Sequence, residues 1–272
     1  SPEGVSGRLK NVETNIQYAS TKAIYKFVNS VHGRKIEKHL YSKAVKKKGG
    51  PKRGTHKPRD DGRTMIDKRP KRVEKRLEFG HFEGDFIESG KDGSGSLLVL
   101  VERKTRYPFI VYTDDRTTKH INTLIGDLLS GIPIKSITLD NDISFQKHEE
   151  LSELVKATVF FCHSYCSHEK GTVENRNKAV RRYAPKKTDF SLMPRQRIEE
   201  IESILRTRFM KCLGYRTPEE VWNKEMEKWK DNQKPVTVRT LKRHALTSSP
   251  PKKSSNNPYI TTPNIEKWVL HG

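Results

Sequence analysis

The sequence predicts an α/β fold, in which a sheet with helices on its faces follows a small all-helical module. Three observations support this prediction. From residue 77 onward three strand-like segments come first, after which strand-like and helix-like segments alternate. Helix-start signals and apolar residues three or four positions apart occupy the first 43 residues. Between these two parts lies a basic stretch with too few apolar residues to build a core.

Residues 1–43 are predicted to form the helical module. Ser1-Pro2-Glu3 combines an N-cap serine, a first-turn proline and an acid near the helix dipole, and Ser20 is the N-cap of a second helix. The second helix is predicted to point four side chains inward: Ala23, Ile24, Phe27 and Val28. Its outward side chains would be Thr21, Lys22, Tyr25 and Lys26. A third short helix is expected from Lys35 to Ala44, with Ile36 and Leu40 inward.

Residues 44–76 are predicted to be a basic linker between the module and the sheet. Residues 34–76 hold 18 Lys and Arg against 5 Asp and Glu, a net charge of +13. Glycine, proline and charge dominate residues 44–64, which are therefore expected to be extended and disordered without a partner. Five cations of this linker are predicted to contact DNA phosphates: Lys46, Lys47, Lys48, Lys52 and Arg53.

Residues 77–222 carry the predicted sheet and its helices. The predicted strands are residues 81–87, 97–101, 108–112, 134–139 and 158–161. The predicted helices are residues 117–129, 146–155, 170–183 and 195–209. The continuous apolar run at residues 97–101 is typical of a strand that is buried on both faces. A C-terminal extension, residues 223–272, is partly of low complexity, with a candidate strand at 235–241 and a terminal segment at 265–270 that could dock on the fold.

The overall charge indicates a polyanionic partner. The 272 residues carry 54 Lys and Arg against 33 Asp and Glu, a net charge of +21, which suits nucleic acid or an acidic membrane surface. No apolar run approaches the length of a membrane span, and no signal peptide opens the chain. Three cysteines are too few for a disulfide scaffold and fit a reducing compartment.

Three carboxylates are predicted to meet at one edge of the sheet. Asp85 lies inside the first strand, Asp140 ends the fourth strand, and Glu174 lies early in a helix. Such a cluster repels itself unless cations bind it, and oxygen ligands of this kind suit Mg²⁺. Two ions about 3.5–4 Å apart could activate an attacking oxygen and stabilise a leaving one. The alternative is that each acid is an ordinary surface residue paired with one of the many Lys and Arg.

The helix that carries Glu174 also carries two cations on the same face. Lys178 and Arg181 follow Glu174 by four and seven residues, where they could track the backbone of a nucleic acid beside the metal site. The alternative is a simple i,i+4 pair between Glu174 and Lys178, and the two interpretations are compatible.

Other polar residues near these motifs are open to two interpretations. His81 and Glu83 alternate with Asp85, so they could support the metal site or form a buried polar network of their own. Tyr165 and Cys166 precede the helix of Glu174 and could line a DNA path. A zinc site is disfavoured, because its four candidate ligands fall within seven residues and leave no loop between ligand pairs. These candidates are Cys162, His163, Cys166 and His168.

Five motifs resemble the IS-thirty family of bacterial insertion-sequence transposases. Residues 80–85, GHFEGD, resemble the family's GHWEGD, and residues 101–107, VERKTRY, resemble its VERKSRY. Asp140-Asn141 matches its DN, and residues 161–175 follow its pattern from FC to GTNEN. Residues 211–221, KCLGYRTPEEV, resemble its closing KCLGYKTPAEV. The 33 residues between Asp140 and Glu174 equal the family's second spacing.

The resemblance covers roughly residues 1–222 and implies a retroviral-integrase-like, RNase H-like catalytic core. Asp85, Asp140 and Glu174 would be its DDE triad, holding two Mg²⁺ ions for which Mn²⁺ could substitute. The implied activity is that of a DNA transposase: water frees a 3′-OH at an element end, and this 3′-OH attacks another DNA phosphate in strand transfer. A circular intermediate of joined element ends is also implied. The chain departs from the family pattern at Asp142, at Ser144, and at residues 167–169 and 208–210, and the triad is intact.

The resemblance also implies the partners. These are double-stranded DNA, as the terminal inverted repeats of the element and as target DNA, and further copies of the chain in a homodimer or higher multimer. No membrane is implied, and the expected location is the bacterial cytoplasm, at the nucleoid. Residues 1–28 are similar to the family's second helix-turn-helix, in which Thr21, Lys22 and Lys26 would contact DNA, the alternative being a solvated face. Since residues 1–28 resemble the second of these modules, the family's first DNA-binding helices are expected to be missing, and the start at Ser1, not Met, fits a fragment of a longer protein.

Three other functions stay open at this point. An RNase H-like nuclease would cut DNA without joining it. A retroelement-type integrase would usually carry an N-terminal zinc module, and residues 1–76 contain no cysteine. A non-catalytic DNA-binding regulator derived from a transposase would not need the intact triad.

Overall fold

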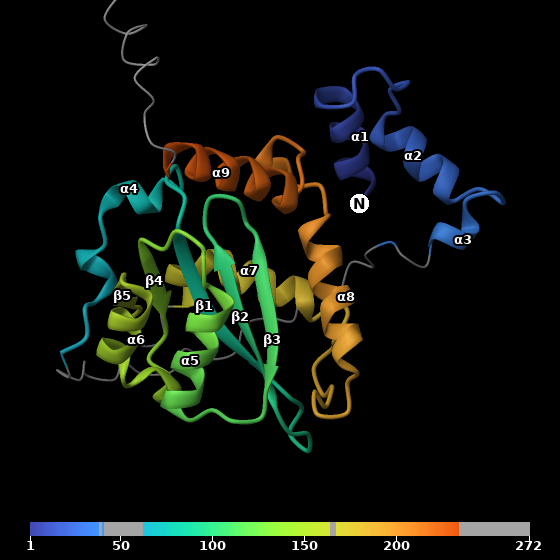
Figure 1. Ribbon diagram of the computed structural model, residues 1–272. Coiled ribbons are helices and arrows are strands. Elements are labelled where there is room, and N and C mark those ends of the chain that lie inside the picture. The colour runs from blue at the N-terminus through green and yellow to red at the C-terminus, as the bar shows by residue number, and fades with distance from the viewer. Residues whose placement is uncertain (38–39, 41–61, 164–166, 234–272) are drawn as a thin grey trace, which may run out of the picture. The chain divides into compact units, whose positions relative to one another are not determined.

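The computed structural model describes residues 1–37, 40, 62–163 and 167–233 (Figure 1). Its centre is a five-stranded mixed sheet in the order β3-β2-β1-β4-β5. The strands are β1 (His81–Glu88), β2 (Ser96–Glu102), β3 (Pro108–Thr113), β4 (Ser136–Leu139) and β5 (Thr158–Phe161). β1–β2 and β2–β3 are antiparallel pairs, whereas β1–β4 and β4–β5 are parallel pairs. The predicted α/β fold class is confirmed, and the mixed sheet fits an RNase H-like core.

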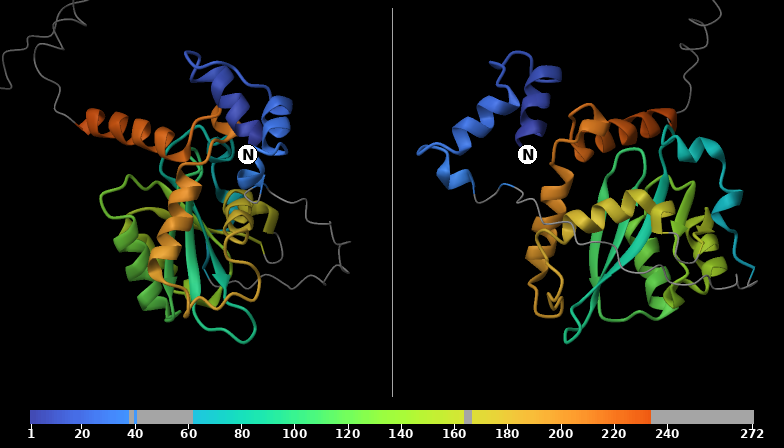
Figure 2. Two further views of the ribbon diagram at one scale, coloured as in Figure 1. Left: turned by 90° about the vertical axis from the view of Figure 1, so that its right-hand side faces the viewer. Right: turned by 180° about the vertical axis from the view of Figure 1, so that it is seen from behind.

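Helices cover both faces of the sheet, as the views in Figure 1 and Figure 2 show. One face carries α5 (Thr118–Leu128) and α6 (His148–Val155), and the other carries α7 (Gly171–Val180) and α8 (Arg195–Arg206). Short connecting helices are η2 (Ile143–Phe145), η3 (Ser167–Lys170) and η4 (Lys211–Leu213). The strands and helices predicted for residues 81–209 are confirmed, with ends that differ by at most three residues.

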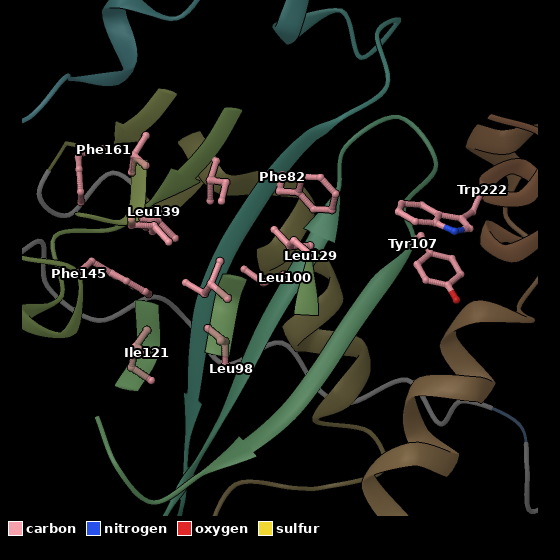
Figure 3. Close-up of a cluster of buried hydrophobic side chains, with 14 residues drawn as sticks. Phe82, Leu98, Leu100, Tyr107, Ile121, Leu129, Leu139, Phe145, Phe161 and Trp222 are labelled. Atoms are coloured by element: carbon pink, nitrogen blue, oxygen red, sulfur yellow. The ribbon is translucent and has the colours of Figure 1, made fainter. Parts of the chain in front are cut away.

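The apolar strand β2 organises the core, because all seven of its residues are buried. Leu98 and Leu100 face the α5 side, where Figure 3 shows them in one cluster with Phe82 and Leu139. Leu97, Val99 and Val101 face the other side, against apolar residues of α7 and α8. The prediction of a strand buried on both faces is confirmed.

The N-terminal part consists of α1 (Pro2–Asn11), α2 (Thr21–Val28) and α3 (Arg34–Glu37). Both predicted N-caps are confirmed. Ser1 Oγ accepts a hydrogen bond from the Gly4 N–H at 3.3 Å, and Ser20 Oγ accepts one from the Ala23 N–H at 3.2 Å. Each bond satisfies one of the N–H groups that a helix start leaves without a partner in the helix.

The predicted inward face of α2 is wrong in part. Val28 is buried and Ile24 is half-buried, but Ala23 and Phe27 are exposed. The reason is that α1 and the turn before α3 cover only one side of α2: Gly33 approaches the backbone of Phe27 and Val28 so closely that no side chain fits there. Ile36, also predicted to point inward, is 47% exposed. The outward prediction holds for Lys22, Tyr25 and Lys26, whereas Thr21 is half-buried.

The last part of the predicted linker belongs to the core instead. It contains η1 (Ile66–Lys68) and α4 (Lys71–Glu74). Met65 bridges to Phe161, whose N–H donates to the Thr64 carbonyl at 2.9 Å, so this segment extends the sheet beyond β5. The Arg69 guanidinium donates to Thr138 Oγ1 at 2.9 Å, and Val73 is buried. The five linker cations predicted to contact DNA lie outside the described residues.

The core also runs further towards the C-terminus than predicted. The helix α9 (Pro218–Gln233) continues past the predicted boundary at residue 222. Trp222 is buried and stacks on Tyr107 with 4.5 Å between ring centroids (Figure 3), and Phe79 lies edge-on to it at 5.1 Å. The predicted segments at 235–241 and 265–270 lie outside the described residues. Among the helices described, none has the length and apolar character needed to cross a membrane.

Candidate active site

Two adjacent parallel strands bring Asp85 and Asp140 to one place. Asp85 lies in β1, and Asp140 directly follows β4, the parallel neighbour of β1. The Lys170 Nζ donates to Asp85 Oδ1 at 3.0 Å and lies 3.1 Å from Asp140 Oδ2. The side chain of Lys170 is only 6% exposed. The two carboxylates therefore share one buried ammonium.

The tight packing of β1 helps to place Asp85. A Cβ atom on Gly84 would lie 2.6 Å from Leu139 Cδ2 and 2.9 Å from Leu100 Cδ2, so any larger residue at this position of the GHFEGD motif would have to displace buried core side chains. The second oxygen of Asp85, Oδ2, accepts a hydrogen bond from Asn177 Nδ2 of α7 at 2.8 Å. Both oxygens of this carboxylate thus have a partner on η3 or α7.

Burial and charge act against each other in this site. Burial raises the pKa of the Asp85 carboxyl; the Lys170 ammonium opposes this shift and the Asp140 carboxylate adds to it. Burial lowers the pKa of Lys170, but the Asp140 and Asp85 carboxylates outweigh it and hold that pKa above its ordinary value. Lys170 is therefore charged at neutral pH and balances part of the negative charge of the pair.

Glu174 is placed differently. Its carboxylate pairs with Lys178 Nζ at 2.8 Å, one helical turn later in α7, and its side chain is 38% exposed. Within residues 1–37, 62–163 and 167–233, no three His, Cys, Asp or Glu side chains are grouped closely enough to hold a metal ion. The structure thus brings two of the three predicted carboxylates together and shows Glu174 in the alternative i,i+4 pair.

Glu83 fixes the start of the helix that carries Glu174. It is fully buried, and its Oε2 accepts hydrogen bonds from the Thr172 N–H at 2.8 Å and the Val173 N–H at 2.9 Å. These are N–H groups of the first turn of α7, where a negative charge is also favoured by the helix dipole. Arg103 Nη1 donates to Glu83 Oε1 at 2.7 Å and balances its charge. Of the two interpretations offered for Glu83, support of the site fits this geometry.

His81 takes part in a different network. Its Nδ1 lies 2.8 Å from Ser136 Oγ, and its Nε2 lies 3.0 Å from Glu78 Oε2. Burial lowers the pKa of His81, while the bond to Glu78 opposes that shift. His81 therefore fits the second interpretation, that of a buried polar network next to β4.

The residues weighed for zinc have other partners. Burial raises the pKa of the Cys162 thiol to about 12, which keeps it protonated. His163 Nδ1 lies 2.9 Å from Glu169 Oε1, and His163 Nε2 lies 2.9 Å from Asp67 Oδ2. Tyr165, Cys166 and the side chain of His168 lie outside the described part of the chain.

A pocket of about 370 Å³ opens beside the two aspartates, lined by residues of β1 and α7 and by Asp142. Asp142 is held by Arg116 Nη2 at 2.6 Å. Arg181 lines this pocket, and its guanidinium donates to the Glu88 carbonyl at 2.5 Å.

Two functional residues had been missed from the sequence, Lys170 and Asn177. A signal was present, because Lys170, Glu174 and Asn177 are spaced by four and three residues at the start of one predicted helix and so share a face. Pairing of the acids with Lys or Arg of the chain was predicted only for surface acids, whereas the Lys170 side chain that binds Asp85 and Asp140 is 6% exposed.

The chain has relatives among known transposases. It is 34% identical over 230 residues to the transposase for insertion sequence element IS4351 of Bacteroides fragilis, an alignment that covers 81% of this chain and 68% of the relative. The chain belongs to the IS30 family of insertion-sequence transposases. The transposase InsI for insertion sequence element IS30A of Escherichia coli is 27% identical over 234 residues, covering 81% of this chain and 60% of that protein. The chain thus spans 60–68% of the length of these relatives, and no family model matches it.

The donor set of this IS30-family site suits a divalent cation. The oxygens of Asp85 and Asp140 both lie within 3.1 Å of one cationic nitrogen, and carboxylate oxygens are the ligands that Mg²⁺ prefers in proteins. In the structure, the Lys170 ammonium lies between the two carboxylates, where a divalent ion would bind. The pair fits a divalent ion, whereas Glu174 lies outside that group as described above.

Proposed function

We propose that this chain is the catalytic part of a DDE DNA transposase that cleaves the ends of a bacterial insertion sequence and joins them to other DNA with Mg²⁺ as cofactor. One observation carries the proposal: Asp85 and Asp140, from adjacent parallel strands of an IS30-family chain, converge on a single cation. The relatives are transposases by name, and the proposal extends that activity to this chain.

The residues that would hold the metal are Asp85 and Asp140, with Glu174 joining them once its side chain leaves Lys178. When bound, two Mg²⁺ or Mn²⁺ ions supply charge that activates an attacking oxygen and stabilises a leaving one. The rest of the work falls to residues of the chain. Asn177 orients the second oxygen of Asp85, and Glu83 holds the start of α7.

The reaction would proceed in two phosphoryl-transfer steps. In the first, a water oxygen attacks the phosphorus at an element end, the bond from phosphorus to the 3′-oxygen breaks, and that oxygen takes up a proton as a free 3′-OH. In the second, the 3′-OH attacks another DNA phosphate, loses its proton and forms a new ester bond as the displaced 3′-oxygen leaves. Attack on the other end of the same element would give the circular intermediate.

The DNA contacts proposed for this chain follow its positive charge of +21. Thr21, Lys22 and Lys26 of α2 would read the terminal inverted repeat, in the manner of a helix-turn-helix. Lys178 of α7 and Arg181, which directly follows this helix, would contact the DNA backbone next to the site. Because two ends must be joined, we expect a homodimer or higher multimer on the DNA, acting at the bacterial nucleoid.

The reaction type is tested with a labelled duplex that carries one element end, incubated with the chain, Mg²⁺ and unlabelled target DNA. A transposase gives the freed 3′-OH strand and a longer, joined product. Cleavage without any joined product would show a nuclease, and binding without cleavage would show a regulator; either result contradicts the proposal.

A further inference from the structure

We propose that Lys170 is the resident counter-ion of the active site, which holds Asp85 and Asp140 while no metal is bound and must leave both before a divalent cation can bind there. This inference rests on the proposed function, because it concerns the same metal site. It assigns to a residue of the chain the control of metal entry.

The site needs a positive charge to be stable. Asp85 and Asp140 come from neighbouring strands and face the same nitrogen, so without a cation their charges would repel each other. The buried ammonium of Lys170 meets both carboxylates and also approaches the Gly84 carbonyl at 3.4 Å. With these three acceptors the Lys170 ammonium is paired, and a paired charge can be buried without the full cost of losing its hydration.

Lys170 and a divalent ion would compete for the same oxygens. Mg²⁺ binds carboxylate oxygens at about 2.0–2.1 Å and demands a near-octahedral shell. The ammonium already uses Asp85 Oδ1 and Asp140 Oδ2 at 3.0 and 3.1 Å. A doubly charged ion on those oxygens would stand next to a like charge, so occupancy by one opposes occupancy by the other.

The side chain can leave without moving the catalytic helix. Lysine carries its charge on a flexible four-carbon stem. The backbone beyond Lys170 is anchored separately, because Glu83 holds the Thr172 and Val173 N–H groups. Metal entry between Asp85 and Asp140 therefore requires rotation of the Lys170 side chain, while both carboxylates and the backbone of α7 keep their places.

The test measures Mn²⁺ affinity without DNA, by titration calorimetry or by the electron paramagnetic resonance signal of free Mn²⁺. Lys170→Met keeps the length of the side chain and removes its charge. We expect this variant to bind Mn²⁺ about tenfold more tightly than the wild type, or more. Lys170→Arg keeps the charge and should stay close to the wild type. The matched control is Lys104→Met, because Lys104 pairs with Glu225 at 2.8 Å outside the site and should leave Mn²⁺ affinity unchanged.

Three outcomes are distinguishable. Tighter Mn²⁺ binding by Lys170→Met alone supports the inference. Equal or weaker binding by this variant, with binding lost in Asp85→Asn, would show a permanent structural ion pair and overturn the inference while the proposed metal site stands. No Mn²⁺ binding by the wild type or by Lys170→Met would overturn the inference and the metal-dependent function together.

Amine labelling of the wild type gives a second readout that does not depend on the folding of a variant. The Lys170 side chain is 6% exposed and should react slowly with an acylating reagent in the absence of divalent cations. Mn²⁺ should raise its labelling rate several-fold, as followed by peptide mass spectrometry, and leave the rate of Lys104 unchanged. An unchanged rate at Lys170 when Mn²⁺ is bound contradicts the inference.

Discussion

Single side chains decide how the charges of this site are held. Lys170 balances Asp85 and Asp140 from the end of η3, and Asn177 binds the outer oxygen of Asp85 from α7. Glu83 does not contact the shared ammonium, but its carboxylate binds the first turn of α7 to β1. This contact fixes the backbone position of α7, and with it the positions of Lys170 and Glu174. Glu83 is a positioning residue, so we expect its replacement to lower the free energy of unfolding in the first place, and to affect the reaction only through the position of α7.

Replacing Glu83 by Gln should destabilise the fold strongly. Glu83 and Arg103 are both buried, so the substitution removes the buried counter-charge of the guanidinium and leaves it only Glu74, at 3.5 Å and 54% exposed. Breaking a buried pair in this way costs about 3–5 kcal/mol. Urea denaturation measures the loss, with Glu200→Gln as the control, because Glu200 pairs with Arg197 on the surface and such pairs contribute about 0–1 kcal/mol. Equal losses in the two variants would show that Glu83 does not anchor α7.

The pair of Glu78 with Lys135 and His81 predicts a defined pH dependence. The hydrogen bonds from Lys135 and His81 lower the pKa of Glu78 from 4.5 to about 2. A carboxyl with a lowered folded-state pKa contributes stability above its unfolded pKa and loses that contribution as the pH falls through the folded value. The difference in free energy of unfolding between the wild type and Glu78→Gln should therefore be full above pH 4.5 and shrink towards about pH 2. A pH-independent difference in denaturant titrations would contradict this assignment.

At the scale of elements, the predicted periodicities identified the strands and helices of the core because each has a buried face that the pattern reports. The run from Leu97 to Val101 is the clearest case, since burial on both faces leaves no polar position. Periodicity did not show what covers a face. Phe27 of α2 belongs to an apolar stripe and is nevertheless 52% exposed, because its neighbours pack on one side only. Glu174 lies on a helix as predicted, but periodicity could not show whether its carboxylate binds Lys178, one turn later, or points towards Asp85 and Asp140.

Charge composition misled the prediction of the linker boundary. Residues 65–74 are basic, but Met65 extends the sheet next to β5 and Val73 is buried, so a few apolar positions outweigh the surrounding charge. Arg69 is also buried, with its guanidinium bound to Thr138 and Glu74. A basic run thus says little about order when its cations have acceptors in the fold.

The docking of α9 gives a prediction at this scale. Trp222 is buried against Tyr107 and Phe109, so Trp222→Ala should lower the free energy of unfolding by about 3–5 kcal/mol. Trp229, seven residues later in α9, is only half-buried, and Trp229→Ala is the matched control with a smaller loss. Urea denaturation followed by circular dichroism makes the comparison. A loss at Trp222 no larger than at Trp229 would separate α9 from the core.

At the scale of the whole molecule, the fold and the family agree on a DNA-processing role. The net positive charge of the chain predicts that its affinity for DNA depends on salt concentration. The sheet and its covering helices lie within residues 62–163 and 167–233, while the strongest run of cations, residues 46–53, lies outside the described part. Five motifs of the sequence led to the family, which the relatives confirm. The sequence could not show which cation sits between the aspartates, because Lys170 comes 85 residues after Asp85 and 30 after Asp140.

DNA binding should weaken steeply as salt rises, because each neutralised phosphate releases about 0.9 counterions from duplex DNA. Replacing Lys46, Lys47, Lys48, Lys52 and Arg53 with Gln should flatten the slope of log K against log salt. The loss should be similar for element-end and random duplexes, since phosphate contacts carry no sequence information. Fluorescence anisotropy at several salt concentrations measures the slope, and an unchanged slope would show that this run does not touch DNA.

The central claim is that Asp85, Asp140 and Glu174 hold the metal for DNA cleavage and joining. Its most direct test is a strand-transfer assay with a pre-cut element end in Mg²⁺, comparing Asp85→Asn, Asp140→Asn and Glu174→Gln with Asp127→Asn, a surface substitution in α5. The three site variants should lose the joined product by orders of magnitude while they bind the element end as the wild type does, because an amide cannot replace a carboxylate as a metal ligand. Asp127→Asn should remain active. Full joining by any one of the three site variants would remove that residue from the metal site. Full joining by both single variants, Asp85→Asn and Asp140→Asn, would contradict the claim as a whole.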